Sequence, residues 1–115
     1  MKYLIDIVID DTRDETEAQI LTEKIAILLG AEKEHRITSY PKFDSSYKIE
    51  FVVVSNKNEH YIEEAVALAD RICSPWLVWY YDDEKKIELI FNRDKNSSFT
   101  PNEFQKIRWA DLQMS

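Results

Sequence analysis

Residues 74–91 read SPWLVWYYDDEKKIELIF, and this stretch decides the fold. A run of six aromatic and aliphatic side chains, Trp76 to Tyr81, is too short for a membrane span and is typical of a strand packed on both faces. Five charged residues follow, and Ile87 to Phe91 then resumes a strand pattern. Two such runs around a short polar connection predict an antiparallel hairpin. We expect this hairpin to hold the densest part of the core.

The residues before the hairpin alternate between strand and helix patterns. Tyr3 to Ile9 predicts an interior strand, and a helix follows from a cap at Asp14 to a left-handed end at Gly30. Residues 33–40 form a polar pattern typical of an edge strand, and residues 47–54 alternate as a third strand. These patterns predict a strand, a helix and two further strands ahead of the second helix.

The second helix is predicted over residues 59–73, because a broad apolar face runs through it and Ser74-Pro75 ends it. After the hairpin, Thr100-Pro101-Asn102-Glu103 is a helix-start signal, so Phe104 to Trp109 should form a short helix or turn packed on the body. Ile20 and Ile27 point away from the main stripe of the first helix. Either the C-terminal tail or a second copy of the chain covers them, or they are exposed.

This order of elements predicts an α+β fold of the ferredoxin-like split βαβ type. The order is strand, helix, strand, strand, helix, strand, strand, then a short C-terminal helix or tail. Right-handed crossovers place both helices on one face of the antiparallel sheet. The opposite face is open unless the tail or a partner covers it. Residues 1–115 are enough for a single domain with its own core.

Composition limits the classes of partner. The net charge of −7 disfavours binding to nucleic acid and would attract a basic protein, although it also serves ordinary solubility. A single cysteine, Cys73, fits a reducing compartment and lies on the apolar stripe of a helix, which favours an inert core thiol. The first residues match neither a signal peptide nor a membrane anchor, so we expect a cytoplasmic protein without a membrane partner.

The sequence contains no recognisable catalytic constellation. His35 and His60 lack Cys or His residues at metal-ligand spacing, and a chain with one glycine cannot form a glycine-rich phosphate loop. Nothing suggests a nucleophilic Ser or Cys beside a base. We therefore predict a protein that is not an enzyme and has no metal or cofactor.

Asp10 and Asp11 close the first strand, where paired carboxylates could hold a divalent metal for phosphoryl chemistry. The stretch Tyr3-Leu4-Ile5-Asp6-Ile7-Val8-Ile9-Asp10-Asp11-Thr12-Arg13 loosely resembles the start of the ferredoxin-like nucleases of CRISPR systems, the Cas2 family. That resemblance implies a metal-dependent nuclease. The alternative is that the two aspartates form a turn.

The face of the sheet opposite the helices is a candidate interface. If the odd-numbered residues of the first and third strands face the helices, then Asp6, Glu50 and Glu88 fall on the other face among apolar neighbours. Carboxylates among aromatic residues suit a protein interface, in which aromatic anchors supply affinity and charges set specificity. Alternatively the tail covers this face, and the acidic helix faces and the Asp82-Asp83-Glu84 turn become the partner surface.

The element order, the acidity, the aromatic hairpin and the Phe104-x-x-Ile107-x-Trp109-Ala110 tail resemble the immunity proteins of contact-dependent growth inhibition and related polymorphic toxin systems. The resemblance implies an antitoxin that forms a tight one-to-one complex with a basic toxin domain, often a nuclease, and covers its active site. The carboxylates that would supply charge are Asp82, Asp83, Glu84, Glu63, Glu64 and Asp70. Trp79 and Tyr81 would be the aromatic anchors.

A second hypothesis is a ferredoxin-like regulatory module that binds a small ligand or dimerises through a sheet edge or through Ile20 and Ile27. The chain would then be a monomer or a weak homodimer.

Overall fold

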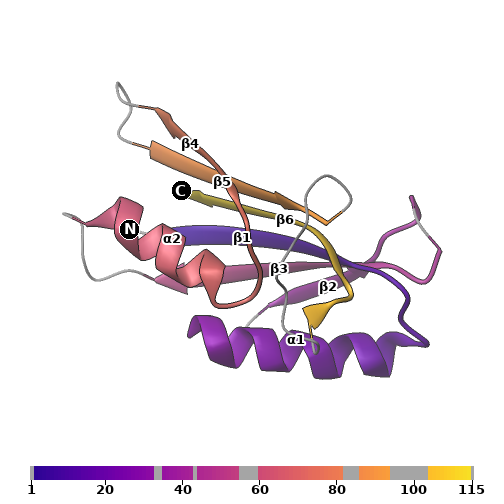
Figure 1. Ribbon diagram of the computed structural model, residues 1–115. Helices are drawn as coiled ribbons and strands as arrows, with labels where there is room; N and C mark the ends of the chain where they lie inside the picture. Colours follow the sequence, from indigo (N-terminus) through magenta and orange to yellow (C-terminus); the bar gives the residue numbers. More distant parts are fainter. Residues whose placement is uncertain are drawn as a thin grey trace.

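The computed structural model describes residues 2–32, 35–42, 44–54, 60–81, 86–93 and 104–114. These residues form two helices and six strands (Figure 1). In order they are β1 (Lys2–Ile9), α1 (Glu15–Leu29), β2 (Arg36–Ser39), β3 (Tyr47–Val54), α2 (Tyr61–Asp70), β4 (Leu77–Tyr81), β5 (Lys86–Asn92) and β6 (Ile107–Met114). The predicted α+β class is confirmed, as are the first three strands and the hairpin.

All six strands form one sheet in the order β2-β3-β1-β6-β5-β4, and every neighbouring pair is antiparallel. The expectation of five strands and a C-terminal helix or tail is therefore wrong. The tail is strand β6, which lies between β1 and β5. A register shift opposite Val8 and Ile9 leaves Arg108 without a partner on β1, so the inward residues Ile107 and Ala110 are three positions apart. This bulge hides the two-residue alternation that marks a strand.

Both helices pack on one face of the sheet, α1 against β3 and α2 against β5. The Asp14 side chain accepts a hydrogen bond from the backbone N–H of Glu17 at 2.9 Å and starts α1. Gly30 ends α1 with φ of 65°, a left-handed conformation that glycine adopts without a steric penalty. The helices and the inward residues of β1, β3, β5 and β6 share one hydrophobic core.

The two strands of the hairpin differ in burial. On β5, Ile87, Leu89 and Phe91 are buried in the core, whereas all five residues of β4 are exposed. The prediction that the hairpin holds the densest part of the core is wrong for β4, because β6 places β1 at the centre of the sheet and β4 at its end. Tyr3 and the inward isoleucines of β1 are no more than 1% exposed.

The end of α2 and the outward residues of α1 can be compared with the sequence predictions. Helix α2 ends at Asp70, before the predicted Cys73, and the Ser74–Pro75 peptide bond that follows is cis. On α1, Ile20 is 56% exposed and Ile27 is 81% exposed. Among the described residues, neither helix has the length and apolarity needed to cross a bilayer. The predicted helix start at residues 100–103 lies outside the described residues.

Candidate functional site

The sheet face that points away from the helices is the candidate site, and we call it the open face. Strand register assigns residues to it, because directly paired residues point to the same side. Asp6 of β1 pairs with Glu50 of β3 and with Asp111 of β6. Glu88 of β5 pairs with Gln113 of β6 and with Trp79 of β4. The open face therefore carries four carboxylates, which we call the open-face acids: Asp6, Glu50, Glu88 and Asp111.

Three of the open-face acids form a row across neighbouring strands. Glu50, Asp6 and Asp111 lie directly opposite one another on β3, β1 and β6. Like charges at directly opposed positions of an antiparallel pair repel and destabilise the sheet. All three residues are half-buried, which weakens the screening of this repulsion by water. The repulsion within the row therefore lowers the stability of the folded protein.

The pKa values of Asp6 and Asp111 are raised mainly by burial, with a smaller contribution from neighbouring carboxylates. Burial, with the charges of Glu88 and Asp6, raises the pKa of Asp111 to about 6, although a hydrogen bond from Gln113 acts in the opposite direction. Burial also raises the pKa of Asp6, where the repulsion of Glu50 adds to the shift and Lys48 opposes it. Both carboxylates are therefore harder to ionise in the folded protein than in the unfolded chain.

Gln113 links two of the open-face acids. Its Nε2 donates to Glu88 Oε2 at 2.6 Å and to Asp111 Oδ2 at 3.1 Å. The other carboxylate oxygen, Asp111 Oδ1, is buried and has no hydrogen-bond partner among the described residues. Beside Gln113 lies a hollow of about 300 Å³, lined by Tyr81, Lys86, Ile87, Glu88, Gln113 and Met114. A buried carboxylate oxygen without a donor disfavours the ionised form of Asp111.

Apolar side chains surround the open-face acids. By register, Leu4, Val52 and Ile90 lie on the same face, and so do Leu77, Trp79 and Tyr81 of β4. Leu4, Leu77, Trp79 and Tyr81 are 41 to 53% exposed. Exposed apolar surface around a few polar groups is the pattern of protein interfaces.

Cations also lie on the open face, on β2, β3 and β5. Arg36 of β2 pairs with Glu50 across the sheet, and Lys48 Nζ is 3.7 Å from Glu50 Oε1. Lys86 pairs with Tyr81 at the other side of the sheet. These cations lie on both sides of Asp6 and Asp111, which occupy the central strands β1 and β6.

The structure separates the site residues that the sequence suggested. Trp79 and Tyr81 are exposed on the open face, as an anchor role requires. Glu63, Glu64 and Asp70 lie on α2, on the other side of the sheet, and Asp82, Asp83 and Glu84 lie outside the described residues. The predicted anchors and the predicted helix acids do not share a surface.

Asp111 and Gln113 are the site residues that sequence reasoning missed. They were read as part of a tail, and only their pairing with β1 and β5 places them beside Asp6 and Glu88. The available signal was the alternation of Ala110 and Leu112 with Asp111 and Gln113, which predicts a half-buried strand.

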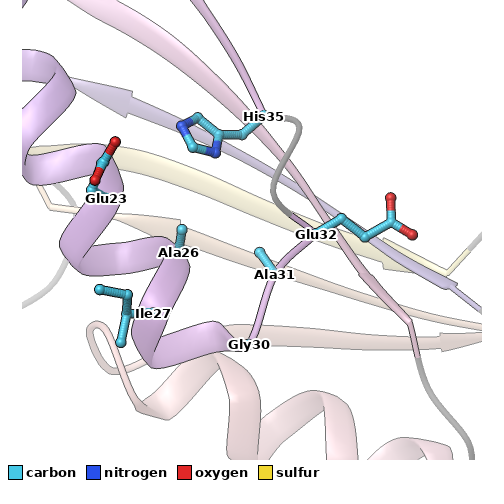
Figure 2. A pocket seen from close by; sticks show the side chains of 7 residues that line it. All are labelled: Glu23, Ala26, Ile27, Gly30, Ala31, Glu32 and His35. Atoms are coloured by element: carbon cyan, nitrogen blue, oxygen red, sulfur yellow. The ribbon is translucent and has the colours of Figure 1, made fainter.

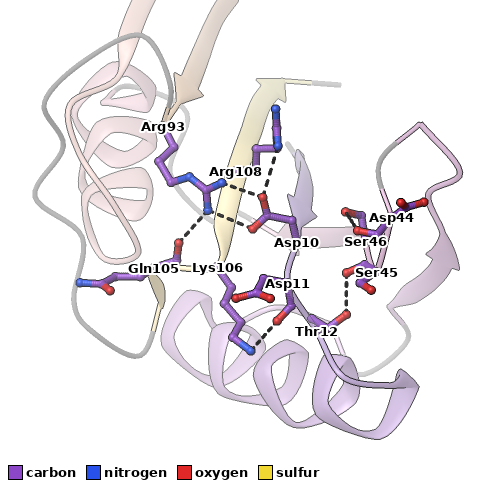
Figure 3. Close-up of polar contacts among 10 residues, drawn as sticks. All are labelled: Asp10, Asp11, Thr12, Asp44, Ser45, Ser46, Arg93, Gln105, Lys106 and Arg108. Atoms are coloured by element: carbon purple, nitrogen blue, oxygen red, sulfur yellow. Dashed lines mark hydrogen bonds and ion pairs between the residues drawn. The ribbon is translucent and has the colours of Figure 1, made fainter.

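A second polar cluster lies where β1 ends (Figure 3). Arg93, which follows β5, donates to Asp10 through Nη2 at 2.6 Å and Nη1 at 3.0 Å. Arg108 of β6 adds a contact with Asp10 Oδ2 at 3.4 Å. Lys106 donates to the Asp11 carbonyl oxygen at 2.7 Å and forms an ion pair with Glu17 of α1. The cluster ties the ends of β1, β5 and β6 to the first turn of α1.

This cluster bears on the metal-nuclease alternative, because Asp10 is one of its two proposed ligands. Burial by itself would raise the pKa of Asp10, but the hydrogen bonds and charges of Arg93 and Arg108 outweigh it and lower the pKa. Both carboxylate oxygens accept from guanidinium groups. Among the described residues, no group of three or more His, Cys, Asp or Glu side chains could hold a metal ion. The geometry favours a structural role for Asp10.

A hollow of about 360 Å³ lies between the end of α1 and the start of β2 (Figure 2). His35 projects over it, toward Glu23 and Ala26 of α1. His35 Nδ1 is buried and has no hydrogen-bond partner in the part of the chain that the structure describes. The His35 ring centroid lies 5.8 Å from that of Phe51. The hollow is on the helix side of the sheet and shares no residue with the open face.

Cys73 belongs to the core. It is 1% exposed, and burial raises the pKa of its thiol well above the usual range, so the reactive thiolate is suppressed.

Comparisons of the chain with protein-family models, with curated proteins and with solved structures found no match.

Proposed function

We propose that this chain is a non-catalytic binding protein that neutralises a basic toxin domain, and that it uses its open face to do so. The observation that carries the proposal is the row of Glu50, Asp6 and Asp111. Directly opposed carboxylates at half-buried positions destabilise the free protein. Burial, with the charges of Glu88 and Asp6, raises the pKa of Asp111 to about 6. A bound cation would turn this repulsion into attraction.

The physical reasoning is that surface groups retained against stability commonly serve a function. An Arg side chain fits the centre of the open face because its guanidinium group carries five donors in a planar fork. It would approach the partly exposed carboxylates of Asp6 and Asp111 from the solvent side of the open face. Leu4, Trp79 and Tyr81 would exclude water around such a contact and thereby strengthen it.

The immunity-protein resemblance supplies the class of partner, and the net charge of −7 suits a basic one. On this proposal the scaffold is a variant of the ferredoxin-like split arrangement. The strand next to β1 is then β6 rather than the first strand of the hairpin, and β4 and β5 extend the sheet. The proposal places the partner surface on the open face instead of on α2 and the Asp82-Asp83-Glu84 turn.

The test uses the toxin-type domain encoded beside this chain in its host. That domain should arrest growth when expressed alone, and co-expression of this chain should restore growth. The complex should weaken as salt rises, because charged contacts contribute to it. A neighbouring domain that neither binds nor is neutralised would contradict the proposal.

Two matched triple variants locate the surface. One carries Asp6→Asn, Glu88→Gln and Asp111→Asn on the open face, and the other carries Glu63→Gln, Glu64→Gln and Asp70→Asn on α2. Each removes three negative charges. We expect the open-face variant to bind roughly 100-fold more weakly and the α2 variant to lose less than about tenfold. The opposite ranking would move the interface to α2.

The ferredoxin-like regulatory module remains the second candidate, and one observation favours its dimeric form. Strand β4 is an exposed apolar strand at the end of the sheet.

A further inference from the structure

Strand β4 differs from every other strand of the described sheet in its side chains. Its five residues, Leu77 to Tyr81, include no charged group, whereas each of the other five strands carries at least one. All five β4 residues are 42 to 53% exposed. The strand lies at one end of the sheet, with β5 as its neighbour.

End strands are usually protected, because an exposed row of backbone donors and acceptors can pair with another chain. Strand β2, at the other end, follows this rule: it is four residues long, and Arg36, Thr38 and Ser39 are its exposed side chains. Strand β4 has neither charge nor proline to prevent pairing. An apolar, uncharged end strand therefore indicates a surface that another strand covers.

We propose that the strand covering β4 is the β4 strand of a second copy, paired antiparallel about a two-fold axis at Trp79. Two copies that each carry a net charge of −7 repel one another, so they approach best where charge is absent. Strand β4 is the uncharged strand of the described sheet. A partner selected for the acidic parts of this protein would instead bring cations, for which β4 offers no counterion.

The side chains of β4 are complementary to themselves in this register. Trp79 lies opposite the second copy's Trp79, Leu77 opposite the second copy's Tyr81, and Val78 opposite the second copy's Tyr80. Aromatic–aromatic and aromatic–aliphatic pairs of this kind stabilise antiparallel strands. A two-fold arrangement also closes after two copies, so it predicts a dimer rather than a fibre.

A contact built on five residues is small, so the dimer should be weak. Interfaces that bury less than about 1,200 Å² belong to transient assemblies. The pairing extends the sheet sideways and leaves the open-face acids uncovered. The dimer therefore does not depend on the proposed toxin-binding function, and either proposal can fail without the other.

Sedimentation equilibrium across roughly 1 to 500 µM protein tests the dimer, because transient contacts dissociate in this range. The apparent mass should rise from 13.7 kDa toward twice that value. Val78→Lys places a charge in the interface without touching the open face, and we expect it to weaken association at least about tenfold. Thr38→Lys, a lysine change on the other end strand β2, should leave association unaltered.

A mass that stays at 13.7 kDa throughout the range would overturn the proposal. Equal association by the Val78→Lys and Thr38→Lys proteins would also overturn it, because the interface would then lie elsewhere. Circular dichroism of each variant confirms that the fold is retained.

Trp79→Cys tests the register directly. Directly opposed residues of an antiparallel pair have Cβ atoms about 4.5–5.5 Å apart, close to the separation that a disulfide spans. Under mild oxidation this variant should form a covalent dimer that a reductant separates, whereas Thr38→Cys should not. The native Cys73 is 1% exposed and does not interfere. Equal cross-linking of both variants would contradict pairing through β4.

Discussion

Asp10 follows β1, and Asp111 lies on the neighbouring strand β6. The surroundings of the two carboxylates shift their pKa values in opposite directions. Asp10 accepts hydrogen bonds from Arg93 and Arg108, which lower its pKa despite burial. Asp111 lies among Asp6 and Glu88, and its pKa is raised to about 6. The first carboxylate stabilises the fold and the second opposes it. The difference indicates that the acidity of this chain has two uses, and that only one of them is structural.

The largest effect should come from Asp10→Asn. The amide keeps the shape but loses the charge that the guanidinium groups of Arg93 and Arg108 contact. We expect the free energy of unfolding to fall by about 2 kcal/mol, below the range for fully buried pairs because the arginines are partly exposed. Urea denaturation at pH 7 measures it. Asp11→Asn changes an exposed neighbour and is the control, so it should change stability little. Equal losses of stability in both variants would contradict a structural role for Asp10.

The second prediction is that the folded protein loses stability at acidic pH. Hydrogen bonds from Lys106 and Arg13 lower the pKa of Glu17 to about 2, and the pKa of Asp10 is also lowered. For such groups the added stability is fully present above the unfolded values of 4.5 and 3.8, and it is lost as pH falls through the folded values. Denaturation should therefore show stability falling between about pH 5 and pH 2. The free energy of unfolding should depend less steeply on pH in the Asp10→Asn variant. An unchanged pH dependence would contradict a lowered pKa of Asp10.

Asp111→Asn should have the opposite sign. The folded pKa of Asp111 lies above the unfolded value of 3.8, so ionising it reduces stability progressively from about pH 4 and fully above pH 6. The asparagine variant should thus be more stable at pH 7.5 by about 1 kcal/mol, after allowing for solvent screening. The gain should shrink as the pH approaches 4. Lower stability of the variant at pH 7.5 would mean that Asp111 is structural, as Asp10 is.

The smallest effect tests the coupling within the row. The carboxyl carbon of Asp111, followed by NMR, should titrate with a midpoint near 6. Asp6→Asn removes one like charge and should lower that midpoint by roughly a few tenths of a pH unit. Asp70→Asn, an exposed change on α2, should leave the midpoint unaltered. If the two variants behave alike, Asp6 and Asp111 do not interact across the strand pair.

Much of the fold follows from local patterns. The cap at Asp14, the left-handed end at Gly30 and the alternation of Tyr47–Val54 predicted α1 and β3 correctly, because their signals depend on neighbouring residues. Asp6, Glu50 and Glu88 were also placed on one face from alternation alone, and register confirms it. Local signals suffice where the backbone geometry repeats.

The errors concern residues whose environment depends on distant partners. The bulge at Arg108 disguised β6, so Asp111 was not recognised as a neighbour of Asp6. The run Leu77–Tyr81 looked like core because a hydrophobic strand can be central or terminal in a sheet, and its composition does not distinguish the two. Inserting β6 between β1 and β5 decided that β4 is the end strand.

The sequence by itself determined the element types, the two-sided character of the sheet and the net acidity, since these depend on residue order and composition. The tertiary structure decided which acids meet. It paired Asp10 with two arginines from distant segments and set Asp111 beside Asp6 and Glu88. Electrostatic energy depends on distances of a few ångströms between residues far apart in the chain, and only the folded arrangement of strands sets those distances.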